Sequence, residues 1–133
     1  MESSSVIPHL RVALGVFLCG GVGALARVLL ASAIDRVGGA VLPHAGTLAV
    51  NLIGCLLFGF LGGLLEGTAR VIVLGGLLGA LTTYSTFAWL LVDLGRSGRH
   101  GTLLLQLVAH VGGGVLCIAA GLAIARLVAG ESG

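Results

Sequence analysis

The amino-acid sequence predicts an all-α membrane protein with four transmembrane helices. Of its 133 residues, 57% are hydrophobic and 9% are charged, whereas soluble domains average about 25% charged residues. Charged and turn-forming residues divide the chain into four apolar segments, each reaching the roughly 20 residues that cross a bilayer core. The 24 glycines suit close contact between helices in lipid. These observations favour a single membrane domain over residues 1–133.

The expected transmembrane spans follow from the positions of the charges. The first span is expected to begin the mature fold, because no basic residue precedes Arg11 and the apolar run that follows is too long for a cleaved signal. Short connections are predicted where glycine and charged residues cluster, as in residues 35–39 and 66–70. In chain order, the expected spans are residues 12–34, 46–65, 71–92 and 102–125.

The third span carries no formal charge but is unusually polar at its centre. Four Ser and Thr hydroxyl groups lie within five positions, at Thr82, Thr83, Ser85 and Thr86, with Tyr84 among them and several glycines just before. Glycine is poorly committed to helical geometry, and a break in a membrane helix frees backbone groups that lipid cannot satisfy. Such a break survives only where it faces protein, water or an ion. We therefore expect the third helix to be broken within residues 79–87, and this stretch to be the functional centre.

The arginines are balanced between the two ends of the expected bundle. One end carries Arg11, Arg70 and Arg126, and the other carries Arg36, Arg96 and Arg99. The positive-inside rule therefore selects no orientation. This balance favours a monomer that inserts both ways and forms an antiparallel, dual-topology homodimer. The alternative is that Arg27, an extra charge toward the second end, decides the orientation alone.

Polar and aromatic side chains within the spans are candidates for an ion pathway. Asn51 and Thr47 are four residues apart and share one helix face, and the Asn51 amide can donate to an anion or join two helices. Tyr84 and Phe87 also share a face, and their positive ring edges can contact an anion or pack in the core. Arg27 can draw anions into a vestibule or hold a partner on another helix.

The fourth span offers two further polar groups on one face, Gln106 and His110. His110 can donate to a permeating ion or bond to a backbone carbonyl. Most polar groups in the spans are therefore donors, which select anions in a pore. No carboxylate lies within a membrane core, although a proton-coupled exporter of cationic drugs would need one.

Other function classes find little support in the sequence. No nucleophile and base are paired as in an enzyme, and no basic cluster indicates a nucleic-acid partner. Cys19, Cys55 and Cys117 lie in apolar segments without CxxC spacing, so we expect small packing residues rather than a disulfide framework or a metal site.

Three stretches resemble the signature motifs of the Fluc (CrcB) family of fluoride channels. They lie in the family's order on the first three of the four expected spans, so together they cover the architecture. The stretches are residues 20–27 (GGVGALAR), 46–54 (GTLAVNLIG) and 79–87 (GALTTYSTF).

The resemblance implies a passive channel that exports toxic cytoplasmic fluoride across a prokaryotic plasma (inner) membrane as a multi-pass protein. Family members are dual-topology dimers with two fluoride pores. A structural Na⁺ lies at the dimer centre, held by backbone carbonyls at the break in the third helix. The matching positions here are Gly79 and Thr82.

The resemblance also assigns expected roles to individual residues. The family's pore asparagine matches Asn51, its upstream threonine matches Thr47, and its paired phenylalanines match Tyr84 and Phe87. We expect Ser85 and Thr86 to join Asn51 and Thr47 as donors, and Arg27 to line a vestibule. This chain departs from the family where Tyr84 replaces a phenylalanine and where Gln106 and His110 stand for a Tyr and a Ser.

These departures leave alternatives to a homodimeric fluoride channel. Some family members are heterodimers of two paralogues, and Tyr84 is compatible with that arrangement. A second alternative function is a small proton-coupled multidrug exporter, which has a similar length. A third is a membrane scaffold that transports nothing.

Overall fold

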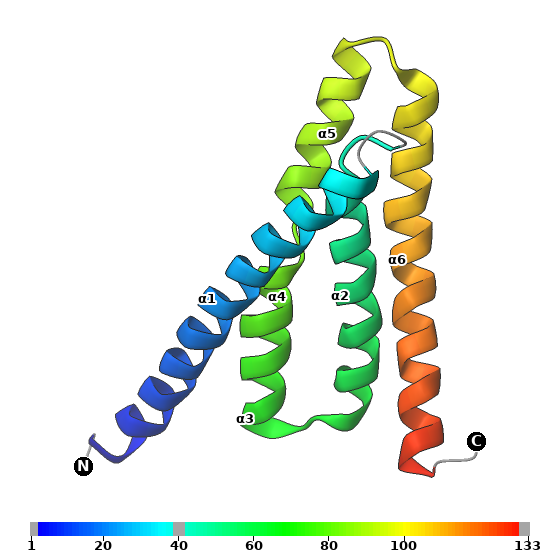
Figure 1. Cartoon of the computed structure of the whole chain (residues 1–133). Coiled ribbons are helices and arrows are strands. Elements are labelled where there is room, and N and C mark those ends of the chain that lie inside the picture. Colours follow the sequence, from blue (N-terminus) through cyan, green and yellow to red (C-terminus); the bar gives the residue numbers. More distant parts are fainter. Residues whose placement is uncertain (1–2, 39–41, 131–133) are drawn as a thin grey trace.

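The computed structural model describes residues 3–38 and 42–130, with side chains from His9 onward. Every element within these residues is helical (Figure 1). In chain order they are α1 (Ser3–Gly38), α2 (Ala45–Leu64), α3 (Gly67–Arg70), η1 (Val71–Leu78), α4 (Gly79–Leu81), α5 (Tyr84–Arg96) and α6 (His100–Ala129).

Within the described residues, four helical stretches are long and apolar enough to cross a membrane, which confirms the predicted all-α membrane architecture. The chain runs up, down, up and down through them, so the start of α1 and the end of α6 lie at the same end of the bundle (Figure 1). The stretches are His9–Gly38, Ala45–Leu64, Gly67–Arg96 and His100–Ala129.

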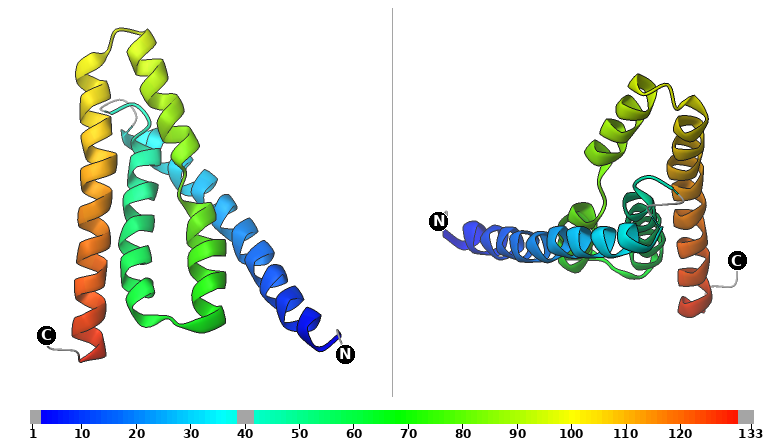
Figure 2. Two further views of the ribbon diagram at one scale, coloured as in Figure 1. Left: turned by 180° about the vertical axis from the view of Figure 1, so that it is seen from behind. Right: turned by 45° about the horizontal axis from the view of Figure 1, so that its top comes forward.

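The third stretch is broken, as predicted, and its break lies at Thr82 and Thr83. These residues are extended, with φ/ψ of −85°/157° and −145°/115°, between the end of α4 and the start of α5. Figure 2 shows the chain changing direction here, so that α5 leaves the axis of the helix below it. The π-helical winding of η1, immediately before α4, was not predicted. Such windings are rare and are frequent at functional sites.

Glycines bring the helices close together at several contacts, two of which join α6 to α2 and α1 to η1. The helix α6 packs along α2, where a Cβ on Gly121 would overlap the backbone of α2 at Leu56. The helix α1 packs against η1 and α4, where a Cβ on Gly23 would overlap the Leu77 carbonyl. Small residues allow this approach of backbones, which is how membrane helices associate without a hydrophobic driving force.

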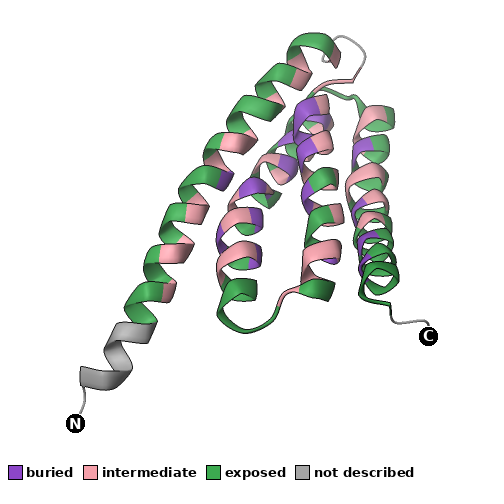
Figure 3. Ribbon diagram, turned by 60° about the horizontal axis from the view of Figure 1, so that its bottom comes forward, coloured by how far each residue is buried: buried purple, intermediate pink, exposed green. Residues whose placement is uncertain are grey.

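The buried residues face the centre of the bundle, and the outer faces are apolar and exposed (Figure 3). A core of Val50, Leu74, Leu78 and Leu81 joins α2 to the third stretch. Along α1, by contrast, large apolar side chains point outward. Phe17, for example, is 76% exposed. Exposed apolar faces of this kind fit contact with lipid or with another membrane chain.

Candidate functional site: the break in the third helix

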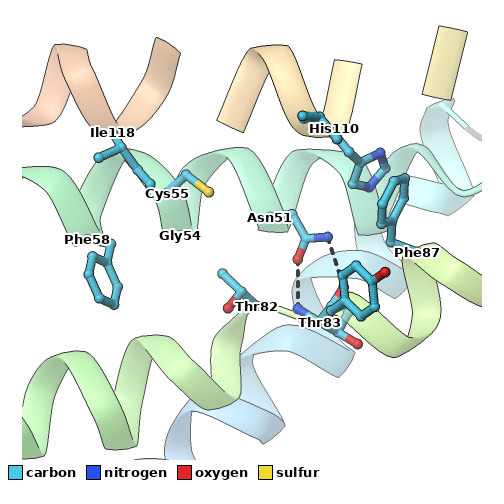
Figure 4. A pocket seen from close by; sticks show the side chains of 11 residues that line it. Asn51, Gly54, Cys55, Phe58, Thr82, Thr83, Phe87, His110 and Ile118 are labelled. Carbon is cyan, nitrogen blue, oxygen red and sulfur yellow. Dashed lines mark hydrogen bonds between the residues drawn. The ribbon is translucent and has the colours of Figure 1, made fainter. Parts of the chain in front are cut away.

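Asn51 on α2 holds the break in the third helix through two hydrogen bonds (Figure 4). Its Nδ2 donates to the Thr83 carbonyl at 3.1 Å, and the Thr83 N–H donates to its Oδ1 at 2.8 Å. Both backbone groups of an extended residue are thereby satisfied where water is scarce. Because an amide NH₂ carries two hydrogens, Asn51 keeps one that is not used by Thr83.

The hydroxyl of Thr83 begins α5 as its N-cap. Its Oγ1 accepts from the Thr86 N–H at 3.3 Å and donates to Thr86 Oγ1 at 3.0 Å. Ser85 Oγ lies 3.3 Å from the same oxygen. Since the single Thr83 hydroxyl hydrogen is given to Thr86, the Ser85 hydroxyl is the donor to Thr83, and the Thr86 hydroxyl hydrogen is left for another acceptor.

These bonds change the partners of two backbone carbonyls. In a continuous α-helix the Gly79 carbonyl would accept from the Thr83 N–H, and the Thr82 carbonyl from the Thr86 N–H. Here the Thr83 N–H donates to Asn51, and the Thr86 N–H donates to the Thr83 hydroxyl. The carbonyls of Gly79 and Thr82 therefore lose their helical donors.

Gly54 on α2 makes room for the last turn before the break. A Cβ at Gly54 would overlap the methyl group of Thr82. The other branch of that side chain, Thr82 Oγ1, donates to the Leu78 carbonyl at 3.1 Å, which also accepts the Thr82 N–H at 3.0 Å. Thr82 is thus fixed in orientation by α4 and in position by α2.

A cavity of about 370 Å³ lies on one side of the break, between α2, α5 and α6. Three aromatic rings meet at its edge: Tyr84 and Phe87 are edge-to-face with centroids 6.0 Å apart, and Phe87 and His110 are stacked at 4.4 Å. We call it the aromatic cavity. Its lining residues are Asn51, Gly54, Cys55, Phe58, Thr82, Thr83, Tyr84, Phe87, His110, Val111 and Ile118.

His110 reaches the aromatic cavity with one ring nitrogen engaged. Nδ1 lies 3.0 Å from the Gln106 carbonyl of its own helix. Nε2 is buried and has no hydrogen-bond partner among the described residues. Figure 4 shows the imidazole lying beside the Phe87 ring. The backbone bond and the ring stack together restrict the orientation of His110.

A second cavity of about 380 Å³ lies on the other side of the break, between α1, α2 and α5. We call it the arginine cavity, because Arg27 lines it. The Nε atom of Arg27 is buried and has no hydrogen-bond partner among the described residues. Thr83 lines both cavities, so the break separates them. The lining residues are Arg27, Val28, Ala31, Ser32, Asp35, Thr47, Val50, Thr83 and Thr86.

The predicted site residues divide between the two cavities. Asn51, Tyr84, Phe87 and His110 line the aromatic cavity, whereas Arg27, Thr47 and Thr86 line the arginine cavity. Thr47 and Asn51, although on one helix, therefore face different cavities.

Two predicted pathway residues line neither cavity. Ser85 is exposed and bonds to Thr83. Gln106 is 0% exposed, and its Nε2 donates to the Pro43 carbonyl at 2.7 Å. Gln106 thus ties α6 to the connection before α2.

Two residues that line the cavities were not among the predicted site residues, although Thr83 belongs to the hydroxyl-rich run noted in the sequence. Thr83 lines both cavities. Its position three residues before Thr86, in a hydroxyl-rich run, is typical of a helix N-cap. Asp35 lines the arginine cavity from the end of α1. No local pattern marks Asp35, because it looks like an ordinary loop charge.

Comparison with known proteins places these features in a family. Residues 14–122 match the family model described as CrcB-like protein, Camphor Resistance (CrcB). A protein of Maridesulfovibrio salexigens, named fluoride-specific ion channel FluC, is 36% identical over 82% of this chain and 90% of its own length. Proteins of Dichelobacter nodosus (FluC) and Symbiobacterium thermophilum (FluC 1) carry the same channel name and are 37% and 39% identical, over 85% and 80% of this chain and 95% and 91% of their own lengths.

Proposed function

Because this chain belongs to the CrcB-like family, whose relatives are named fluoride-specific ion channels, we propose that it conducts fluoride across a prokaryotic membrane. Its four apolar stretches make it a multi-pass membrane protein. The relatives are channels rather than enzymes by name, and we infer the same for this chain.

The observation that carries the proposal is a set of unused donors around the break. Fluoride is small and strongly hydrated, so a pore must replace its water with donors. The second Nδ2 hydrogen of Asn51 is available at the aromatic cavity, and the Thr86 hydroxyl hydrogen is available at the arginine cavity. Thr83 stands between them. The permeating ion passes from one donor set to the other along this residue.

Aromatic edges continue the pathway beyond Asn51. The edge-to-face pair of Tyr84 and Phe87 presents ring hydrogens, which carry partial positive charge. Such contacts are weak, so they accompany an anion without trapping it. His110, stacked on Phe87, limits the rotation of that ring. The roles of donor and edge contact therefore fall to different residues of the same cavity.

The functional unit we propose is an antiparallel dimer of two identical chains, with one pathway per chain. Tyr84 is 79% exposed although it lines the aromatic cavity, and a second chain packed against this face would cover it. The balanced arginines favour insertion in both orientations. The exposed apolar faces of the single chain supply the surface for such an association.

A structural Na⁺ at the dimer centre fits the backbone at the break. The carbonyls of Gly79 and Thr82 lack their helical donors, and Gly79 is exposed on the outside of the chain. Hard cations are bound by oxygen ligands, backbone carbonyls among them. Bound there, Na⁺ would supply positive charge that compensates carbonyl oxygens that lipid cannot satisfy.

Fluoride efflux from liposomes tests the proposal. The purified chain is reconstituted alone in liposomes loaded with potassium fluoride, and external fluoride is measured with an ion-selective electrode. A passive channel releases fluoride only after a potassium ionophore removes the charge imbalance. Drug movement driven by a pH gradient, without fluoride efflux, would instead indicate the exporter. Efflux that requires a co-reconstituted paralogue would indicate a heterodimer, and no flux of either kind would indicate a scaffold.

A further inference from the structure

Asp35 at the end of α1 caps a different helix. Its Oδ1 accepts from the Gly46 N–H at 2.8 Å, across 11 residues of sequence. Gly46 lies in the first turn of α2, where backbone N–H groups have no helical partner. The N-cap residue of α2, His44, has a left-handed φ of 56° and provides no side-chain bond. Asp35 therefore provides the side-chain acceptor that the local N-cap residue does not.

This cap orients the part of α2 that faces the ion pathway. Thr47, the residue after Gly46, lines the arginine cavity, and Asn51 follows one turn later at the break. Gly46 also packs directly against α1, because a Cβ there would overlap the Ala31 backbone. The hydrogen bond and the close contact together set the position of the start of α2 relative to α1.

The negative charge of Asp35 is not needed for capping. Asparagine caps helices about as well as aspartate, because only an oxygen acceptor is required. Yet the charged carboxylate lines the same cavity as Arg27, two turns away on the same helix. Eight residues of helix correspond to about 12 Å. An anion in the arginine cavity thus experiences one positive and one negative side chain.

Resting on the proposed fluoride conduction, we propose that Asp35 is a positioning and affinity-setting residue: its oxygen orients α2, and its charge weakens anion binding in the arginine cavity. Conduction requires binding that is strong enough for entry and weak enough for release. Arg27 and the Thr86 hydroxyl favour entry, and Asp35 favours release.

The size of the charge effect follows from Coulomb's law. For an anion held beside Arg27, and so about 12 Å from Asp35, an effective dielectric constant of about 20 corresponds to a roughly three- to tenfold change in the binding constant once partial screening is included. The Debye length shrinks from about 10 Å at 0.1 M salt to about 3 Å at 1 M. An effect of the charge therefore depends on ionic strength, whereas an effect of the capping bond does not.

The test compares Asp35→Asn, Asp35→Ala and the wild type in the full-length protein in liposomes. Initial fluoride flux is measured against fluoride concentration at about 0.02 M and about 1 M ionic strength, adjusted with an impermeant salt. At low ionic strength Asp35→Asn should lower the half-saturating fluoride concentration about three- to tenfold without raising the maximal flux. At high ionic strength the difference should become smaller. Asp93→Asn is the matched control, because Asp93 is exposed near the end of α5 and lines neither cavity. The ends of α1 and α5 lie at the same end of the bundle (Figure 1).

The capping bond is tested separately by thermal unfolding in detergent. Asp35→Asn should unfold at the wild-type temperature, whereas Asp35→Ala should unfold several degrees lower, because only asparagine keeps the acceptor for Gly46. Equal half-saturation in wild type and Asp35→Asn at low ionic strength would overturn the charge role. Equal unfolding temperatures for all three proteins would overturn the cap. A wild type without flux would instead refute the proposed function.

Discussion

At the scale of single residues, the Asn51 amide combines a structural role with the proposed role toward the ion. It satisfies the two backbone groups of Thr83 and retains one hydrogen at the aromatic cavity. The sequence left open whether Asn51 lines a pathway or joins two helices. The geometry is compatible with both at once, since the amide joins α2 to the break and faces the cavity.

Replacing Asn51 with aspartate should abolish fluoride flux. The carboxylate keeps the acceptor for the Thr83 N–H but faces the Thr83 carbonyl without a donor, and it places a negative charge where the anion must pass. We expect flux within the background of protein-free liposomes. Size-exclusion chromatography shows whether the variant still assembles, and a well-assembled variant with wild-type flux would remove Asn51 from the pathway.

Replacing Phe87 with isoleucine should slow flux about tenfold or more, because the apolar volume remains while the positive ring edge is lost. Phe87 is 7% exposed and contacts both Tyr84 and His110. The matched control is Phe17→Ile on the outer face of α1, where the ring is 76% exposed. Equal fluoride efflux rates from the two variants would argue against the edge contact.

At the scale of the elements, the broken stretch depends on close support from α2. Gly54 leaves space for the Thr82 methyl group, and Asn51, one turn earlier, bonds to Thr83. The two contacts fix both extended residues of the break against one face of α2. The shape of α2 therefore controls the backbone geometry at the functional centre.

Gly54→Ala should lower both flux and thermal stability. The added methyl group would overlap Thr82, so α2 and the break must separate or Thr82 must change rotamer. We expect a cost of about 1–3 kcal/mol, measured as a lower unfolding temperature in detergent.

Gly112→Ala on α6 is the matched control for Gly54→Ala. A Cβ at Gly112 has no atom within 4 Å in the described part of the chain. This substitution should keep the flux and slightly favour the helix, since alanine is a better helix former than glycine. Similar losses in the two variants would mean that space for Thr82 is not the cause.

At the scale of the whole molecule, the proposed assembly depends on the balance of the arginines. Each chain presents three arginines at each end, with Arg27 within the first span. An antiparallel dimer needs both orientations in the same membrane. A small change in charge at one end should therefore affect assembly without touching the pathway.

Fixing the orientation of the chain should abolish flux, and mixing two fixed orientations should restore it. Thr68 in α3 and His100 at the start of α6 are exposed. Because α3 and the start of α6 lie at opposite ends of the bundle (Figure 1), Thr68→Arg and His100→Arg bias insertion in opposite directions. Each variant expressed alone should give few active dimers, whereas their co-expression should recover fluoride efflux. Wild-type efflux from a variant shown by accessibility labelling to have a single orientation would contradict the antiparallel dimer.

Much of the fold was determined by the sequence alone. A bilayer requires long apolar helices with internally satisfied backbones, so composition and charge spacing were enough to predict four of them. The hydroxyls of residues 79–87 and the glycines at and just before the start of this stretch predicted the break, because they combine weak helical preference with groups that can replace backbone partners.

Only the tertiary structure decided which groups meet. Asn51 and Thr83 are 32 residues apart, Asp35 and Gly46 are 11 apart, and Gln106 and Pro43 are 63 apart. Helical periodicity relates residues within one turn or two and carries no information about partners on other helices. For that reason the sequence could place Thr47 and Asn51 on one helix face, although they line two different cavities. Thr83 lies between these cavities.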